Sequence, residues 1–160
     1  MLTKNFYAYM RGALQGVTVD FKITNGGKKY STSITTSSIP PFKAIGYWAT
    51  DFTSKGVCFG TGTTPPTLSD YYLESVLDNA QIAVTPPSAV AFSQGDAFDE
   101  YSASFGVTNK TDGPVTISEV GLLAYPGVNA ALVDRTVLDT PVTIPAHETK
   151  HIAYTIRFNY

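Results

Sequence analysis

Cys58 is the residue whose type and spacing first suggest covalent chemistry. The stretch Gly56-Val57-Cys58-Phe59-Gly60 has the letters of a nucleophile elbow, with cysteine in the position of serine. Such an elbow leads directly into a helix and needs a histidine and an acid beside the nucleophile. The chain continues instead as Thr61-Gly62-Thr63-Thr64-Pro65-Pro66, a loop that cannot begin a helix at once. The alternation around Cys58 therefore predicts a buried thiol that packs in a strand like a small apolar side chain.

Gly60 and Gly62 are spaced like two glycines of a phosphate-binding loop. The third glycine of a dinucleotide fingerprint is missing, and so is the lysine that ends a P-loop. The pair therefore predicts a tight turn in which the absence of side chains lets two backbones approach closely. No nucleotide or other cofactor is predicted.

His147 and His151 lie on either side of Glu148 and are the obvious candidates for metal ligands. A metal site needs converging side chains, whereas the turn at Pro145-Ala146 and the strand expected from Lys150 separate these residues. We therefore expect solvated turn residues and no metal. A trimer axis would bring such histidines together from different chains, and this alternative stays open.

Asp96, Asp99 and Glu100 have the composition of a calcium loop. They lack the regular ligand spacing and the internal glycine of such loops. The stretch Ser93–Glu100 is therefore predicted to be a solvated acidic loop.

Aromatic side chains make up 12% of the chain and are candidates for a sugar-stacking platform or a subunit interface. Tyr47 and Trp48 are adjacent, and adjacent residues on a strand point to opposite faces. Both are buried only if another chain covers the outer face, which favours an interface. The residues predicted to contribute to it are Phe6, Tyr9, Tyr47, Trp48, Tyr71 and Tyr72.

Composition bounds the fold and the partners. The chain has 160 residues, 43% hydrophobic and 15% charged, as expected for a single domain (1–160) with its own core. A balance of 11 basic against 13 acidic residues provides no surface for nucleic acid. No apolar run approaches the roughly 20 residues of a membrane helix. The single cysteine and the lack of an apolar leader favour synthesis in the cytoplasm.

Strand patterns dominate the positioning elements. Val17–Thr24 alternates apolar and polar residues, and Asn25-Gly26-Gly27 then predicts a hairpin that returns through Lys28–Ile34. The apolar phase of Val115–Ala124 shifts near Ser118 and Glu119, which predicts a β-bulge. Further strands are predicted at Phe42–Thr50, Lys55–Gly60, Tyr101–Thr108, Leu132–Leu138, Val142–Ile144 and Lys150–Tyr160.

Two segments show helical spacing. Leu2–Leu14, within an N-terminal arm or short helix (1–15), follows a pattern that Thr3 would cap. Thr67 stands three residues before Asp70 and predicts one short helix or helical turn over 67–77. Short strands with regular turn signals predict an all-β fold, an antiparallel β-sandwich of jelly-roll or immunoglobulin-like type.

The stretch Gly60–Glu74, which reads GTGTTPPTLSDYYLE, resembles a segment of small virion proteins of tailed bacteriophages. Ile117–Leu122 is similar to the I-x-E-x-G-L strand of those proteins, and the resemblance extends from Val57 to the C-terminus. The resemblance implies an architectural motif without catalytic residues. A physical reading of the same residues predicts that Asp70 caps a helical turn and that Glu119 accepts backbone N–H groups left free at the bulge. The motif comprises Gly60, Gly62, Pro65, Pro66, Asp70, Leu73, Glu74, Glu119, Gly121 and Arg135.

The resemblance implies a non-enzymatic structural component of a virion assembled in the bacterial cytoplasm. The first expectation is a capsid decoration or auxiliary protein that self-assembles, for example as a trimer, and contacts the major capsid protein. A tail fibre or baseplate adaptor that binds tail proteins, or a carbohydrate-binding attachment module, is the alternative. A cysteine hydrolase is a third hypothesis and requires an accessible Cys58 thiol of low pKa. Neither nucleic acid nor a membrane is expected as a partner.

Overall fold

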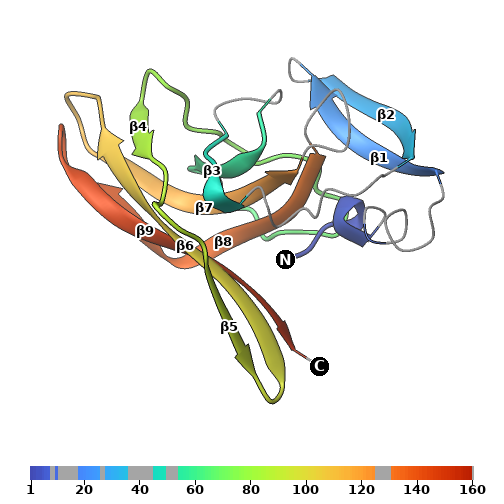
Figure 1. Ribbon diagram of the computed structural model, residues 1–160. Helices are drawn as coiled ribbons and strands as arrows, with labels where there is room; N and C mark the ends of the chain where they lie inside the picture. Colours follow the sequence, from blue (N-terminus) through green and yellow to red (C-terminus); the bar gives the residue numbers. More distant parts are fainter. Residues whose placement is uncertain are drawn as a thin grey trace.

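The computed structural model describes residues 1–7, 10, 18–25, 28–35, 45–49, 54–124 and 131–159, and the chain is mostly β with antiparallel sheets, as predicted (Figure 1). The strands are β1 (Thr18–Asn25), β2 (Lys28–Thr35), β3 (Gly56–Gly60), β4 (Ile82–Thr85), β5 (Ala91–Gly95), β6 (Phe98–Asn109), β7 (Val115–Ala124), β8 (Ala131–Ile144) and β9 (Thr149–Asn159). Among these residues, no helix is long and apolar enough to cross a membrane.

β1 and β2 form a sheet of their own. They pair antiparallel, and Asn25 opposite Lys28 closes a hairpin with a two-residue loop. This confirms the hairpin predicted from the Asn25-Gly26-Gly27 signal, because a two-residue connection fixes the register.

Two larger sheets build the core. One has the order β3-β7-β8, and in the other β6 pairs with β4 and β5 on one side and with β9 on the other. Phe59 of β3 meets Phe105 of β6 edge to face, with ring centroids 5.8 Å apart, and both side chains are fully buried. Both sheets are open.

The predicted bulge in β7 is confirmed. The pairing of β7 with β8 shifts register between Ile117 and Glu119, at the place where the apolar phase changes. β8 itself is one continuous strand, so the prediction of two short strands at Leu132–Leu138 and Val142–Ile144 was wrong at the junction. The strand runs through Pro141, because a proline is tolerated in a strand at the edge of a sheet.

The segment predicted as the loop Ser93–Glu100 is a strand pair. β5 and the first half of β6, with the last residues of β9, form a limb that projects from the body (Figure 1). We call Ala91–Ser102 with Thr155–Asn159 the limb. Its side chains are largely exposed or half-buried, so no burial imposes the alternating pattern by which a strand is recognised. The short β4 also escaped sequence analysis.

Two other predicted elements differ from the structure. Residues 67–77 contain a turn, closed by a hydrogen bond from the Asp70 amide to the Thr67 carbonyl, and no helix follows it. Within the predicted strand Phe42–Thr50, the described residues Ile45–Ala49 form a short turn with one parallel bridge, between Trp48 and Val57. Local spacing was overridden by contacts with β3 in both places.

The N-terminal segment adds to the edge of β8. Leu2 forms an antiparallel bridge with Asp134, and residues 4–7 turn into a helix, as predicted. The Thr3 hydroxyl donates to the Leu132 carbonyl over 2.6 Å, whereas we expected it to cap the helix. The Leu132 carbonyl at the edge of β8 is a buried acceptor, and the Thr3 hydroxyl bonds to it rather than to the helix.

Candidate functional site

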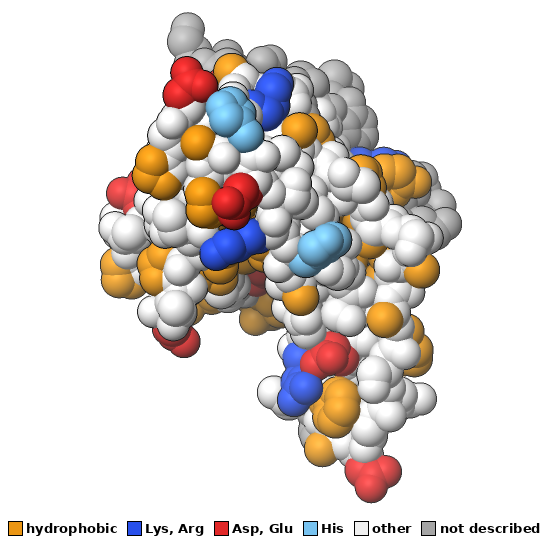
Figure 2. Space-filling view, turned by 90° about the vertical axis from the view of Figure 1, so that its left-hand side faces the viewer, with side chains coloured by type: hydrophobic (Ala, Val, Ile, Leu, Met, Phe, Trp, Pro, Cys, Tyr) orange, Lys and Arg blue, Asp and Glu red, His pale blue; other side chains and the backbone are white. Residues whose placement is uncertain are grey.

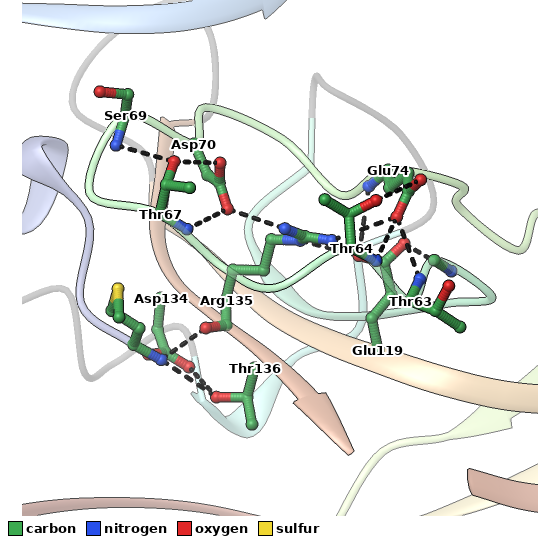
Figure 3. A network of polar contacts seen from close by, with 12 residues as sticks. Thr63, Thr64, Thr67, Ser69, Asp70, Glu74, Glu119, Asp134, Arg135 and Thr136 are labelled. Carbon is green, nitrogen blue, oxygen red and sulfur yellow. Dashed lines mark hydrogen bonds and ion pairs between the residues drawn. The ribbon is translucent and has the colours of Figure 1, made fainter. Parts of the chain in front are cut away.

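Arg135 on β8 is the centre of a buried ion network (Figure 3). Its Nε lies 2.8 Å from Glu119 Oε2, and its Nη1 lies 2.8 Å from Asp70 Oδ2. Nη2 lies 3.6 Å from Glu74 Oε2. The Arg135 side chain is 4% exposed, so one buried cation holds three carboxylates at the boundary between the sheet and a loop.

Glu119 is the most enclosed member, with a fully buried side chain. One carboxylate oxygen accepts the amides of Gly62 and Ser75, over 3.1 and 2.8 Å. The other accepts the amide of Glu74 over 3.2 Å in addition to Arg135. We expected Glu119 to accept backbone N–H groups left free at the bulge. Its backbone donors are instead the amides of Gly62, Glu74 and Ser75, in the loop Gly60–Val76.

Gly60 and Gly62 make this enclosure possible. A Cβ at Gly60 would lie 2.5 Å from the Ser75 carbonyl oxygen, and one at Gly62 would lie 2.5 Å from Glu119 Oε1. Real Cβ atoms do not approach that closely, so only glycine lets the loop and the carboxylate meet. The predicted close approach of two backbones is present at this pair.

The outer carboxylates order the loop. Glu74 accepts both amides of Thr63 and Thr64 and the Thr64 hydroxyl, over 2.9 to 3.0 Å. Asp70 accepts the amide and the hydroxyl of Thr67, over 2.9 and 2.7 Å. Asp70 therefore caps a turn, as expected, although that turn does not begin a helix.

The electrostatics hold these groups in their charged forms. Burial raises the pKa of Asp70, but hydrogen bonds from the Thr67 amide and the Arg135 guanidinium outweigh it and lower the pKa below its ordinary value. Hydrogen bonds from the Thr64 amide and hydroxyl lower the pKa of Glu74. Burial lowers the pKa of Arg135, and its bonds to Asp70 and Glu119 reverse the shift and raise it. Carboxylates held in this way accept hydrogen bonds and are poor general acids at neutral pH.

Cys58 lies beside this network as a buried thiol, as predicted. It is 1% exposed, and its Sγ lies 3.4 Å from the Gly121 carbonyl oxygen. Burial, followed by the negative charge of Glu119, raises the pKa of the thiol far above its ordinary value. A nucleophilic cysteine needs the opposite environment.

A second polar cluster forms around Asp134, which sequence analysis missed. Its Oδ1 lies 3.0 Å from the Met1 amino nitrogen, and its Oδ2 accepts the Tyr154 hydroxyl over 2.8 Å. Asp134 is 6% exposed, so these two partners offset the cost of burying its carboxylate. The signal in the sequence was a charged pair, Asp134-Arg135, directly after the apolar run Ala131-Leu132-Val133.

The remaining acidic and histidine candidates do not lie together in one site. His147 lies 3.2 Å from Asp112, and His151 is an exposed residue of β9. Asp99 and Glu100 lie on β6, not in a loop, and Glu100 pairs with Arg157. Among the described residues, no group of three His, Cys, Asp or Glu side chains is arranged to hold a metal ion.

The aromatic residues predicted to form an interface lie in different environments in the fold. Phe6 is buried and stacks on Phe158 at 6.0 Å, so it belongs to the core, contrary to our expectation. Tyr47 is 51% exposed, with Lys55 Nζ 4.8 Å from its ring centroid. Trp48, Tyr71 and Tyr72 are half-buried, and Tyr9 lies outside the described residues.

Most of the motif residues converge on one place. Gly60, Gly62, Asp70, Glu74, Glu119 and Arg135 form the network itself, and Leu73 packs over Gly121, where a Cβ would lie 2.8 Å from Leu73 Cδ2. Pro65 is exposed and Pro66 half-buried in the loop between them.

Comparison of the chain with models of protein families, with curated proteins and with solved structures finds no match.

Proposed function

We propose that this chain is a non-enzymatic structural component of a tailed-phage virion, most specifically a capsid decoration or auxiliary protein that self-assembles. The proposal begins from the resemblance of Gly60–Glu74 and Ile117–Leu122 to small virion proteins. For the fold we propose the finer assignment of a jelly-roll or immunoglobulin-like sandwich.

One observation carries the proposal. The charged residues that bear the resemblance form ion pairs and hydrogen bonds with one another. Arg135 pairs with Asp70, Glu74 and Glu119 within the chain. A motif whose carboxylates are all engaged within the protein serves architecture, because catalysis needs a group that is free to exchange a proton or bind a substrate. The buried, high-pKa thiol of Cys58 supports the same reading against a cysteine hydrolase.

The test is the copy number of the chain in purified particles of the phage that encodes it, measured by quantitative mass spectrometry against the major capsid protein. Hundreds of copies per particle are the expected result for a capsid decoration protein. A handful to a few dozen copies would move the proposal to the tail or baseplate. Absence from particles would overturn it.

A carbohydrate-binding attachment module is the second candidate, and the exposed ring of Tyr47 is the observation in its favour. Aromatic rings at a surface stack on sugars. A glycan array with the wild type and Tyr47→Ala tests it directly. Binding by the wild type that is lost in the variant would favour attachment, and absence of binding would remove this candidate.

A further inference from the structure

We propose that β5 is a self-association strand, which pairs antiparallel with β5 of a second copy across a two-fold axis. β5 lies at an edge of its sheet, because it pairs with β6 on one side and ends the strand order. Residues Ala91–Gln94 are all exposed. Figure 2, seen from the β9 side of the molecule, shows the limb as a separate projection below the body.

The other open edges among the described strands carry devices that oppose pairing with a second chain. Charged residues and proline disfavour such pairing, and so do very short strands. β9 contains Lys150, His151 and Arg157, while β8 contains Asp139 and Pro141. β1 and β2 contain charged residues as well, and β4 has four residues and is followed by Pro86-Pro87.

The edges of β3 and of the first part of β8 are covered within the chain. β3 bridges to Trp48 and Val76 on the side away from β7. The amide of Arg135 donates to the Met1 carbonyl over 3.0 Å, and the amide of Thr3 donates to the Val133 carbonyl over 3.0 Å. Among the described strands, the other edges are therefore charged, very short, next to proline or covered, whereas β5 carries neither a charge nor a proline.

The sequence of β5, Ala-Phe-Ser-Gln-Gly, contains no charge and no proline. A second copy of this strand meets it without like-charge repulsion, whereas self-pairing of β9 would bring two copies of the cations Lys150 and Arg157 into one sheet. Charge compatibility thus selects β5 over β9 for a self-contact and selects a second copy as the occupant.

The side chains of β5 also suit a two-fold axis. With Ser93 opposite the partner's Ser93, Phe92 faces the partner's Gln94. The two Phe92 rings then become diagonal neighbours, about 7–8 Å apart, which aromatic side chains can span. Phe92 is 55% exposed and already lies 5.0 Å from Tyr101 in its own chain. The contact would extend this aromatic row across two copies.

This inference deepens the proposed function, since it names the contact by which the chain self-assembles. Its test uses the purified chain alone. A failure of the β5 contact is thus distinguishable from absence of the chain from particles.

Disulfide trapping provides the positive test. In Ser93→Cys, mild oxidation is expected to give a covalent dimer, because paired strand residues have the Cα separation that a disulfide needs. Cys58 is buried and is therefore not expected to form an intermolecular disulfide. Ser104→Cys is the matched control, since Ser104 is exposed on the same face of the sheet but lies on the central strand β6. Equal crosslinking of both variants, or of neither, would overturn the proposal.

Sedimentation equilibrium provides the second test. The wild type is expected to dimerise reversibly, and Ser93→Lys is expected to raise the dissociation constant about fivefold to tenfold, because two like charges then oppose each other. Ser104→Lys adds the same charge and is expected to leave the constant within about twofold. A monomeric wild type, or a dimer indifferent to Ser93→Lys, would overturn the β5 contact.

Discussion

The ion network and the limb are two polar regions of one chain with opposite designs. In the network, Arg135 is 4% exposed and its carboxylate partners accept backbone amides as well. In the limb, Arg157 is 53% exposed and pairs with Glu100 over 2.7 Å without comparable enclosure. An ion pair in the first setting cannot lose a partner without leaving a buried charge, whereas water replaces either partner in the second. The network thus fixes the loop against the sheet, whereas the ion pair of the limb remains open to solvent.

Removal of one cation from each region tests this contrast most strongly. Arg135→Met is expected to lower the free energy of unfolding by about 3–5 kcal/mol, because Glu119 stays buried without its counter-charge. Arg157→Met, the matched control, is expected to lower it by less than about 1 kcal/mol. Urea denaturation of both variants measures the difference, and equal effects would show that the two regions do not differ as described.

A methyl group added to a glycine of the network, compared with one added to a glycine of β6 outside both regions, gives the next largest effect. Gly60→Ala forces a Cβ against the Ser75 carbonyl and is expected to destabilise the fold by about 1–3 kcal/mol. In Gly106→Ala the new Cβ meets its first neighbour at 3.6 Å, an ordinary contact. This variant of β6 is expected to gain up to about 1 kcal/mol through the unfolded state. Thermal denaturation with two-state analysis measures the stability of both variants. Loss of stability in Gly106→Ala alone would contradict the close approach described at Gly60.

Acid should weaken the network through its outer carboxylates. The pKa values of Asp70 and Glu74 in the folded chain lie below their ordinary values of 3.8 and 4.5. A lowered carboxyl pKa contributes stability above the unfolded-state value, and this contribution is lost as the pH falls through the folded-state value. The urea concentration at the midpoint of unfolding of the wild type is therefore expected to decrease when the pH is lowered below about 4.

Asp70→Asn is the matched variant for this measurement. It is expected to be less stable than the wild type at neutral pH, by on the order of 1 kcal/mol, and to lose less on acidification. Parallel curves for the two proteins would exclude Asp70 as a source of the pH dependence.

The smallest effect is expected at the limb. Phe92→Ser should change the stability of the protomer by less than about 0.5 kcal/mol at concentrations where any dimer has dissociated, because the side chain is 55% exposed. Leu73→Ala, which removes a side chain that is 5% exposed above Gly121, is expected to cost about 2–5 kcal/mol. Chemical denaturation at low protein concentration compares them. A large loss in Phe92→Ser would mean that the limb supports the body.

Sequence reasoning succeeded where a local pattern has one physical outcome. The hairpin of β1 and β2 followed from its two-residue turn, and the bulge at Ser118-Glu119 followed from a shift in apolar phase. The burial of Cys58 was also predicted correctly, although β3 is buried on both faces and does not show the alternation on which the prediction rested. In the site, the sequence drew attention to Glu119 and Arg135 as motif residues but did not place them together.

Tertiary structure decided the rest, for two physical reasons. Exposed strands such as β5 carry no burial pattern, so their pairing depends on β6 and is invisible in the local sequence. Asp70, Glu74, Glu119 and Arg135 are distant in the sequence, and the register of β7 against β8 together with the close approach at Gly60 and Gly62 brings them together. The sequence by itself determined the β class, the turns and the bulge. The three-dimensional packing determined which charges are buried and where the exposed strand β5 lies.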